Sequence, residues 1–133
     1  IPLNTDSTLK GQTVFLAERC AELIQPNIIT DRTVIDVMAF TMNANSIPYQ
    51  DKENFEDYAS EFIREYDYIF YISPYGIPIE DNGVRETDEH YRDIIDFTIT
   101  TLIKKYGHRC PSIEKISGST EERIQQILNI TGL

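Results

Sequence analysis

Acidic and basic side chains of types that could do chemistry occur in three short segments of the chain. The first is Thr30-Asp31-Arg32-Thr33, with Asp36 a few residues further along. A carboxylate such as Asp31 can hold Mg²⁺ through water or accept a proton from a hydroxyl nucleophile, and a guanidinium such as Arg32 can hold a phosphate or ribose oxygen. The simpler interpretation is that Asp31 caps the next helix and Arg32 pairs with a surface acid.

The second segment, residues 80–86, contains Asp81-Asn82-Gly83-Val84-Arg85. Asp-Asn and Asn-Gly are turn formers, and a plain hairpin accounts for them without any function. The functional interpretation is a flap whose Arg85, helped by Arg92, closes over transferring phosphates, stabilises their charge and excludes water.

The third segment is Ser117-Gly118-Ser119-Thr120-Glu121-Glu122-Arg123. A strand, a turn of small residues and a capped helix could present backbone groups to a purine ring, with Arg123 alongside. The Ser119 and Glu122 pair is also a capping box, which is expected here whether or not a ligand binds.

Composition narrows the classes of partner. The chain has 133 residues, which fits one domain spanning 1–133, and 22 acids against 12 bases give a net charge of −10. This balance argues against duplex nucleic acid as a partner, because phosphate neutralisation needs clustered Lys and Arg. No apolar stretch reaches the roughly 18–20 residues of a membrane span. Two widely separated cysteines predict neither disulfides nor a zinc site, and we expect a cytoplasmic protein.

The elements that must position the three segments alternate between helices and strands. We expect helices over about 6–25, 34–42, 52–65 and 88–106, the last ended by Gly107, and a final helix capped by Ser119 that buries Ile124, Ile127 and Leu128. Strands are predicted at 27–30, 68–72 and 112–116. This alternation predicts an α/β fold, a parallel sheet flanked by helices, with ligands beyond the carboxyl ends of the strands.

Three strands make a thin sheet for this many helices. We therefore expect that a further strand, in a central position, is absent from this sequence and that the domain is incomplete at its N-terminus. Residues 75–92 are expected to form a lid-like segment beside the sheet.

Taken in their order along the chain, these segments and elements resemble the later two-thirds of a P-loop nucleoside or nucleotide kinase. The chain is most similar to the AAA-family ATPase and kinase group that includes a bacterial ribosylnicotinamide kinase domain. The resemblance covers about residues 8–128 and is carried by the segment from Ile28 to Asp36, the strand at 66–72, the lid at 81–85 and the closing turn at 117–124.

The resemblance implies ATP and Mg²⁺ as cofactors and a nucleoside, nucleotide or ribosylated small molecule as phosphoryl acceptor. Asp31 would be the catalytic carboxylate near Mg²⁺ and the acceptor hydroxyl, and Arg85 the lid arginine. The acceptor would contact Arg32, Arg92, Asp36 and the region around Tyr49. Gly118, Ser119 and Thr120 would border the adenine, with Arg123 beside it.

One departure from the family pattern is serious. None of the six glycines belongs to a Gly-x-x-x-x-Gly-Lys-Ser/Thr loop, which cradles the donor phosphates in this family. We expect that loop to be supplied by sequence before Ile1, directly after the missing central strand. The alternatives left open are a non-catalytic nucleotide-binding or interaction module, and an ATPase without a small-molecule acceptor.

Overall fold

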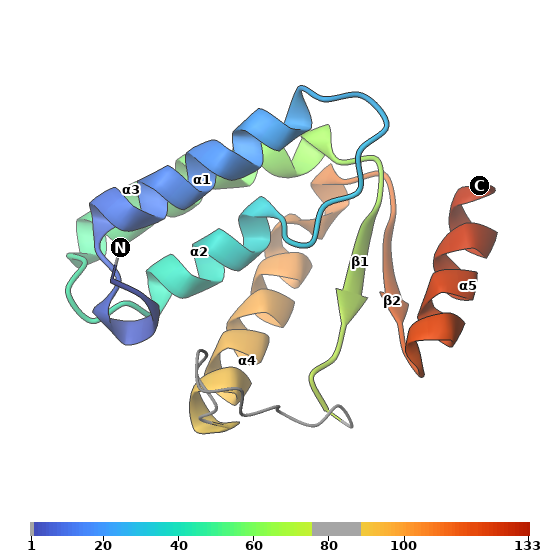
Figure 1. Ribbon diagram of the computed structural model, residues 1–133. Coiled ribbons are helices and arrows are strands. Elements are labelled where there is room, and N and C mark those ends of the chain that lie inside the picture. The colour runs from blue at the N-terminus through green and yellow to red at the C-terminus, as the bar shows by residue number, and fades with distance from the viewer. Residues whose placement is uncertain (1, 76–88) are drawn as a thin grey trace.

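The computed structural model describes residues 2–75 and 89–133. The fold is mixed α/β, mostly helical, with one small parallel sheet in the described part (Figure 1). The helices and strands follow in the order α1 (Leu9–Leu23), α2 (Val34–Met42), α3 (Tyr49–Ser60), β1 (Ile69–Ile72), α4 (Glu89–Tyr106), β2 (Ile113–Ile116) and α5 (Thr120–Thr131). Short 3-10 turns occur at Asn4–Asp6, Glu61–Glu65 and Gly107–Arg109.

Helix α2 lies at the centre of the core. Its apolar residues include Val34, Met38 and Ala39, which are completely buried, and it contacts α1, α3 and α4 (Figure 1). A helix that is apolar on most sides is expected to be surrounded in this way. The start of α2 also carries the Asp31 and Arg32 segment, so the best-packed element of the fold holds the candidate site.

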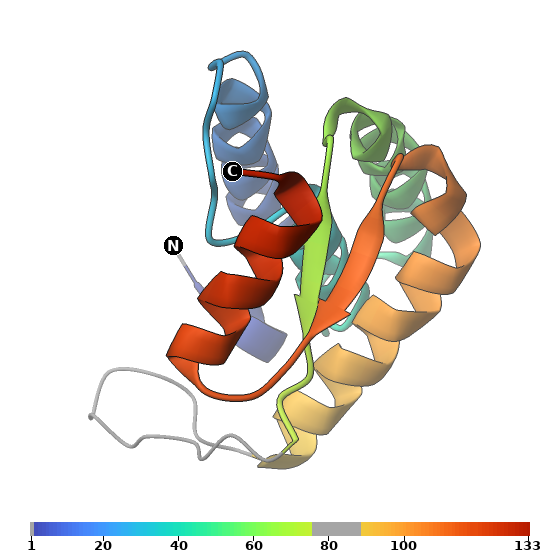
Figure 2. The same cartoon turned by 90° about the vertical axis from the view of Figure 1, so that its right-hand side faces the viewer.

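The sheet consists of β1 and β2, paired in parallel from Ile69 opposite Ile113 to Ile72 opposite Ile116. Helix α5 lies on one side of this pair, and α2 and α4 lie on the other (Figure 2). Both faces of a parallel sheet are normally covered, which explains the near-continuous apolar run of β1.

Several predictions of local structure are confirmed. The helix over 34–42 is present with the predicted bounds, and the strands at 68–72 and 112–116 and the helix at 88–106 differ by a residue at most. Ser119 caps α5 with the predicted capping box, in which the Ser119 side chain accepts from the Glu122 backbone and the Glu122 carboxylate accepts from the Ser119 backbone.

The predicted strand at 27–30 is wrong. These residues follow α1 as an irregular extended segment, and Ile29 is 82% exposed. A strand needs a neighbour for its backbone groups and its side chains. The segment runs beside β1 in the same direction (Figures 1 and 2), but no strand of the described residues pairs with it.

Other boundaries are corrected as well. Helix α1 begins later than predicted because the Thr8 side chain accepts from the Gly11 N–H, whereas the Ser7 hydroxyl closes the preceding turn on the Asn4 carbonyl. The helix predicted over 52–65 begins at Tyr49 and becomes a 3-10 turn at Glu61.

The C-terminal third needs two further corrections. Gly107 does not end α4 in a left-handed conformation but opens a 3-10 turn; the described glycines with positive φ are Gly118 and Gly132. Helix α5 buries none of its residues, so the predicted burial of Ile124, Ile127 and Leu128 is wrong. Its apolar side chains lie over a sheet too narrow to cover them.

Candidate functional site

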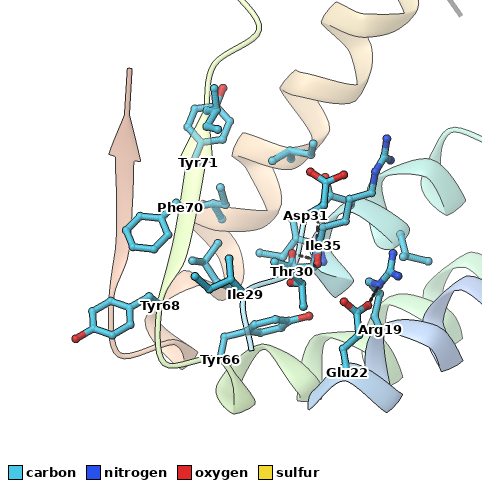
Figure 3. Close-up of a pocket in the computed structure, with 18 of the residues that line it drawn as sticks. Arg19, Glu22, Ile29, Thr30, Asp31, Ile35, Tyr66, Tyr68, Phe70 and Tyr71 are labelled. Atoms are coloured by element: carbon cyan, nitrogen blue, oxygen red, sulfur yellow. Dashed lines mark hydrogen bonds and ion pairs between the residues drawn. The ribbon is translucent and has the colours of Figure 1, made fainter. Parts of the chain in front are cut away.

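A groove of about 1510 Å³ lies between β1 and the segment that follows α1. Residues from Asn27 to Asp36 form one wall, and β1 with residues 65–68 forms the opposite wall. Helices α1 and α4 and the end of α5 contribute most of the remainder. Figure 3 shows Ile29, Thr30 and Asp31 on one side of this groove, with Phe70 and Tyr71 on β1 across from them. The volume exceeds the roughly 300–1,000 Å³ of most small-molecule sites.

Asp31 and Arg32 both line this groove and are exposed. The turn that holds them is fixed by the Thr30 hydroxyl, which donates to the Arg32 carbonyl at 2.8 Å. Thr33, and not Asp31, caps α2, so the simpler interpretation of Asp31 as a helix cap is wrong. The carboxylate of Asp31 is therefore available to a ligand in the groove.

The Arg32 guanidinium lies over the Phe40 ring, 5.5 Å from its centroid. None of the ion pairs found among residues 2–75 and 89–133 involves Arg32. Stacking on an aromatic face orients the guanidinium while leaving its N–H groups available to an anion.

Asp36 has a structural partner. Its carboxylate accepts a hydrogen bond from the Thr33 backbone N–H at 2.9 Å and completes a capping box at the start of α2. Burial raises the pKa of Asp36, although the Thr33 N–H and the Arg32 charge act in the opposite direction. Asp36 also lines the groove, but its hydrogen bond to Thr33 in the helix cap explains its position.

A second acidic group, not predicted from the sequence, lines the groove from α4. Asp96 is only 8% exposed, and its carboxylate accepts a hydrogen bond from the Tyr71 hydroxyl of β1. Burial, together with the adjacent Asp96 carboxylate, raises the pKa of Tyr71 to about 12. The one sequence signal for Asp96 is that this acid directly follows Ile95, a residue of the apolar face of the helix.

Arg92, one turn before Asp96 on α4, also lines the groove. Its guanidinium lies 5.9 Å from the centroid of the Tyr75 ring, and its Nε lies 3.7 Å from the Asp93 carboxylate. The structure thus brings Arg92 to the same groove as Asp31 and Arg32.

Other predicted site residues do not meet there. Tyr49 is 74% exposed at the start of α3, beyond the end of α2 that is remote from Asp31, and its hydroxyl donates to Glu53 at 2.8 Å. The predicted adenine-binding residues, which also do not line the groove, make local contacts around the start of α5. They are Gly118, Ser119, Thr120 and Arg123. Arg85 and most of the predicted lid, residues 76–88, lie outside the described residues.

A magnesium ion in this groove would have few protein ligands. No group of three or more His, Cys, Asp or Glu side chains gathers around a common point in the part of the chain that the structure describes. Mg²⁺ in nucleotide sites is held by one or two carboxylates, several waters and the substrate phosphates, so a three-residue cluster is not required. Asp31 fits the role of the single carboxylate.

Comparisons with known proteins returned no match: no family model, no curated protein and no solved structure is similar to this chain. In the described residues, no helix has the length and apolar character needed to cross a membrane.

Proposed function

We propose that the chain is part of an ATP-dependent phosphotransferase that acts on a nucleoside, nucleotide or ribosylated small molecule. The observation that carries the proposal is that one groove includes, among its charged residues, the Asp31 carboxylate and the Arg32 and Arg92 guanidinium groups, from two different parts of the fold. Phosphoryl transfer depends mainly on positioning and on balancing negative charge, and these residue types serve both purposes.

Each residue has a distinct role in this proposal. Asp31 holds Mg²⁺ through water and lies near the acceptor hydroxyl, whose proton it can accept. Arg32, oriented by Phe40, binds the acceptor, and Arg92 binds phosphoryl oxygens from the α4 side. Mg²⁺ supplies charge neutralisation for the phosphates when bound.

The donor nucleotide extends beyond the groove. The turn at Gly118, Ser119 and Thr120 follows the carboxyl end of β2. Because β1 and β2 are parallel, it lies at the same end of the sheet as the carboxyl end of β1. In the proposal this turn and Arg123 border the adenine, and Arg85 covers the phosphates. Asp36 supports Arg32 and Asp31 through the helix cap, and Tyr49 belongs to a separate surface.

A phosphate loop is required in addition, and the 133 residues contain no Gly-x-x-x-x-Gly-Lys-Ser/Thr sequence. This lack favours a second candidate function, a nucleotide-binding or interaction module without phosphoryl transfer. The two candidates differ in one measurable property, because only the first consumes ATP in the presence of an acceptor.

The test is ADP release by the full polypeptide that the gene encodes, supplied with Mg²⁺, ATP and a panel of nucleosides and nucleoside monophosphates. Release that depends on an acceptor supports the kinase. Release that is independent of every acceptor indicates an ATPase, and binding of ATP without release indicates the non-catalytic module. Either of the last two outcomes overturns the proposal.

A further inference from the structure

One edge of β1 faces the groove and has no strand beside it in the described residues. The Ile69 N–H donates to the Ser112 carbonyl at 2.9 Å, so the backbone groups of Ile69 face the β2 side. Successive residues of a strand direct their N–H and C=O groups to opposite edges. Phe70 and Ile72 therefore present their backbone donors and acceptors to the groove.

The opposite wall of the groove is also extended. Residues 28–30, between a turn at Asn27 and a bend at Asp31, run in the same direction as β1 (Figures 1 and 2), and both Ile28 and Ile29 expose much of their side chains. Two strands that flank a third lie roughly 9–10 Å apart, twice the spacing of paired strands. An added strand would give both extended walls a partner.

The faces above and below such a strand are apolar. The Ile69 side chain is buried in the core and the Tyr71 hydroxyl reaches α4, so the alternate residues Phe70 and Ile72 point to the α5 side. Ile72 is 41% exposed there, and α5 directs Ile127 to the same groove without burying any residue. An apolar strand with side chains on both faces would cover these surfaces.

Charge further restricts the occupant. The groove wall carries seven carboxylates and three guanidinium groups, and one of the latter, that of Arg19, pairs with Glu22. Carboxylates occur at both ends of β1, with Asp67 before it and Asp96 beside its carboxyl half. A strand flanked by basic residues matches this distribution better than an acidic strand does.

We propose that the groove binds an extended polypeptide strand, apolar in its centre and basic at its flanks, which adds to the free edge of β1 in parallel orientation. Main-chain hydrogen bonds to Phe70 and Ile72 supply the pairing, as in other cases of strand addition to an open sheet edge. Docking of a strand does not itself depend on phosphoryl transfer, so the two proposals can fail separately.

The test uses the 133-residue chain and a synthetic peptide, Lys-Lys-Val-Ile-Val-Ile-Val-Gly-Lys-Lys. Hydrogen exchange of the Phe70 and Ile72 amides is expected to slow by at least about tenfold with saturating peptide, because both amides gain partners. The Ile69 and Tyr71 amides, which face β2, should change much less. A peptide N-methylated at every apolar residue keeps the side chains, loses the N–H donors and should not protect Phe70 or Ile72.

A matched pair of variants isolates the edge contact. Phe70→Pro removes the N–H that faces the groove, a change that strand edges tolerate, whereas Phe70→Ala removes the ring and keeps the N–H. The peptide should bind Phe70→Pro about tenfold more weakly than Phe70→Ala, the loss expected for one hydrogen bond. If Phe70→Pro does not fold, the hydrogen-exchange pattern of the unaltered chain with the two peptides still tests the proposal.

Three results would overturn the proposal. One is an unchanged exchange rate at Phe70 and Ile72 with bound peptide. Another is equal binding of the N-methylated peptide, which would indicate nonspecific apolar association. The third is protection of the same amides that rises with protein concentration without peptide, which would identify a second copy of the chain as the occupant.

Discussion

The hydroxyl of Tyr66 accepts a hydrogen bond from the Val34 backbone N–H at 3.1 Å. This contact joins the residue that follows the Glu61–Glu65 turn to the first residue of α2, across 32 positions of sequence. Val34 immediately follows the Asp31-Arg32-Thr33 turn, so the Tyr66 hydroxyl holds the start of α2 and that turn in place on one wall of the groove.

Replacing Tyr66 by Phe should destabilise the fold. Val34 is completely buried, so loss of the hydroxyl leaves its N–H without that acceptor, at a cost of about 1–3 kcal/mol. Urea unfolding of Tyr66→Phe measures the change in free energy. Tyr68→Phe is the matched control, because Tyr68 is 41% exposed, and equal effects of the two substitutions would contradict the role of the contact.

Alkaline pH should weaken the fold. Burial raises the pKa of Tyr66 to about 12, and burial together with Asp96 does the same for Tyr71. Since an unfolded tyrosine has a pKa of about 10, the folded state favours the protonated phenol. The resulting stability is fully present below about pH 10 and is lost as the pH rises toward about 12.

Urea unfolding between about pH 9 and pH 11 tests this dependence. The free energy of unfolding should fall over this range, and the fall should be smaller in Tyr66→Phe/Tyr71→Phe. An equally steep fall in the double variant would assign the dependence to other groups.

Asp36 should behave as a helix cap in stability measurements. Asp36→Ala removes the acceptor of the Thr33 N–H and should cost about 0.5–2 kcal/mol, whereas Asp36→Asn keeps an acceptor oxygen and should cost less. Thermal or urea unfolding of both variants makes the comparison. Equal losses in the two variants would mean that the negative charge, which both remove, matters more than the acceptor oxygen of the cap.

The arginines should differ in their kinetic effects. Arg32→Ala should raise KM for the acceptor, because Arg32 is assigned to acceptor binding, whereas Arg85→Ala should lower kcat by orders of magnitude, as expected for an arginine that contacts the transferring phosphoryl group. Steady-state ADP release by the full polypeptide separates the two. Unchanged kcat in Arg85→Ala would mean that residues 80–86 form only a hairpin.

Much of the fold could be predicted from sequence because its signals are local. The apolar run from Tyr68 to Ile72, the spacing within α4, and the Ser119 and Glu122 capping box each depend on neighbouring residues alone. The same holds for the helix from Val34 to Met42, whose bounds were predicted without error.

The wrong predictions concern residues whose structure depends on packing or pairing with elements distant in the sequence. Residues 27–30 have strand character in sequence, but a strand also needs a paired neighbour, and the described chain provides none. Helix α5 has a predicted apolar stripe that remains exposed for a similar reason: the sheet beneath it has two strands.

The candidate site was predicted in part. Asp31, Arg32 and Arg92 line one groove, although the segment before Asp31 is not a strand and Arg92 lies on α4. The Tyr71 and Asp96 pair could not be predicted, because it joins a strand to a helix 25 positions later and neither residue belongs to a motif. Tyr49 was placed near the acceptor by resemblance alone, and the length of α2 separates it from Asp31.

The most direct test of the central claim is acceptor-dependent ADP release by the full polypeptide in three forms: unaltered, Asp31→Asn and Asp57→Asn. Asp57 is an exposed residue of α3 outside the groove and serves as the charge-matched control. The unaltered and Asp57→Asn proteins should release ADP at similar rates, and Asp31→Asn should lose activity by at least about a hundredfold while its circular dichroism is unchanged. Equal activity of all three proteins, or no acceptor-dependent release by any of them, would contradict the account.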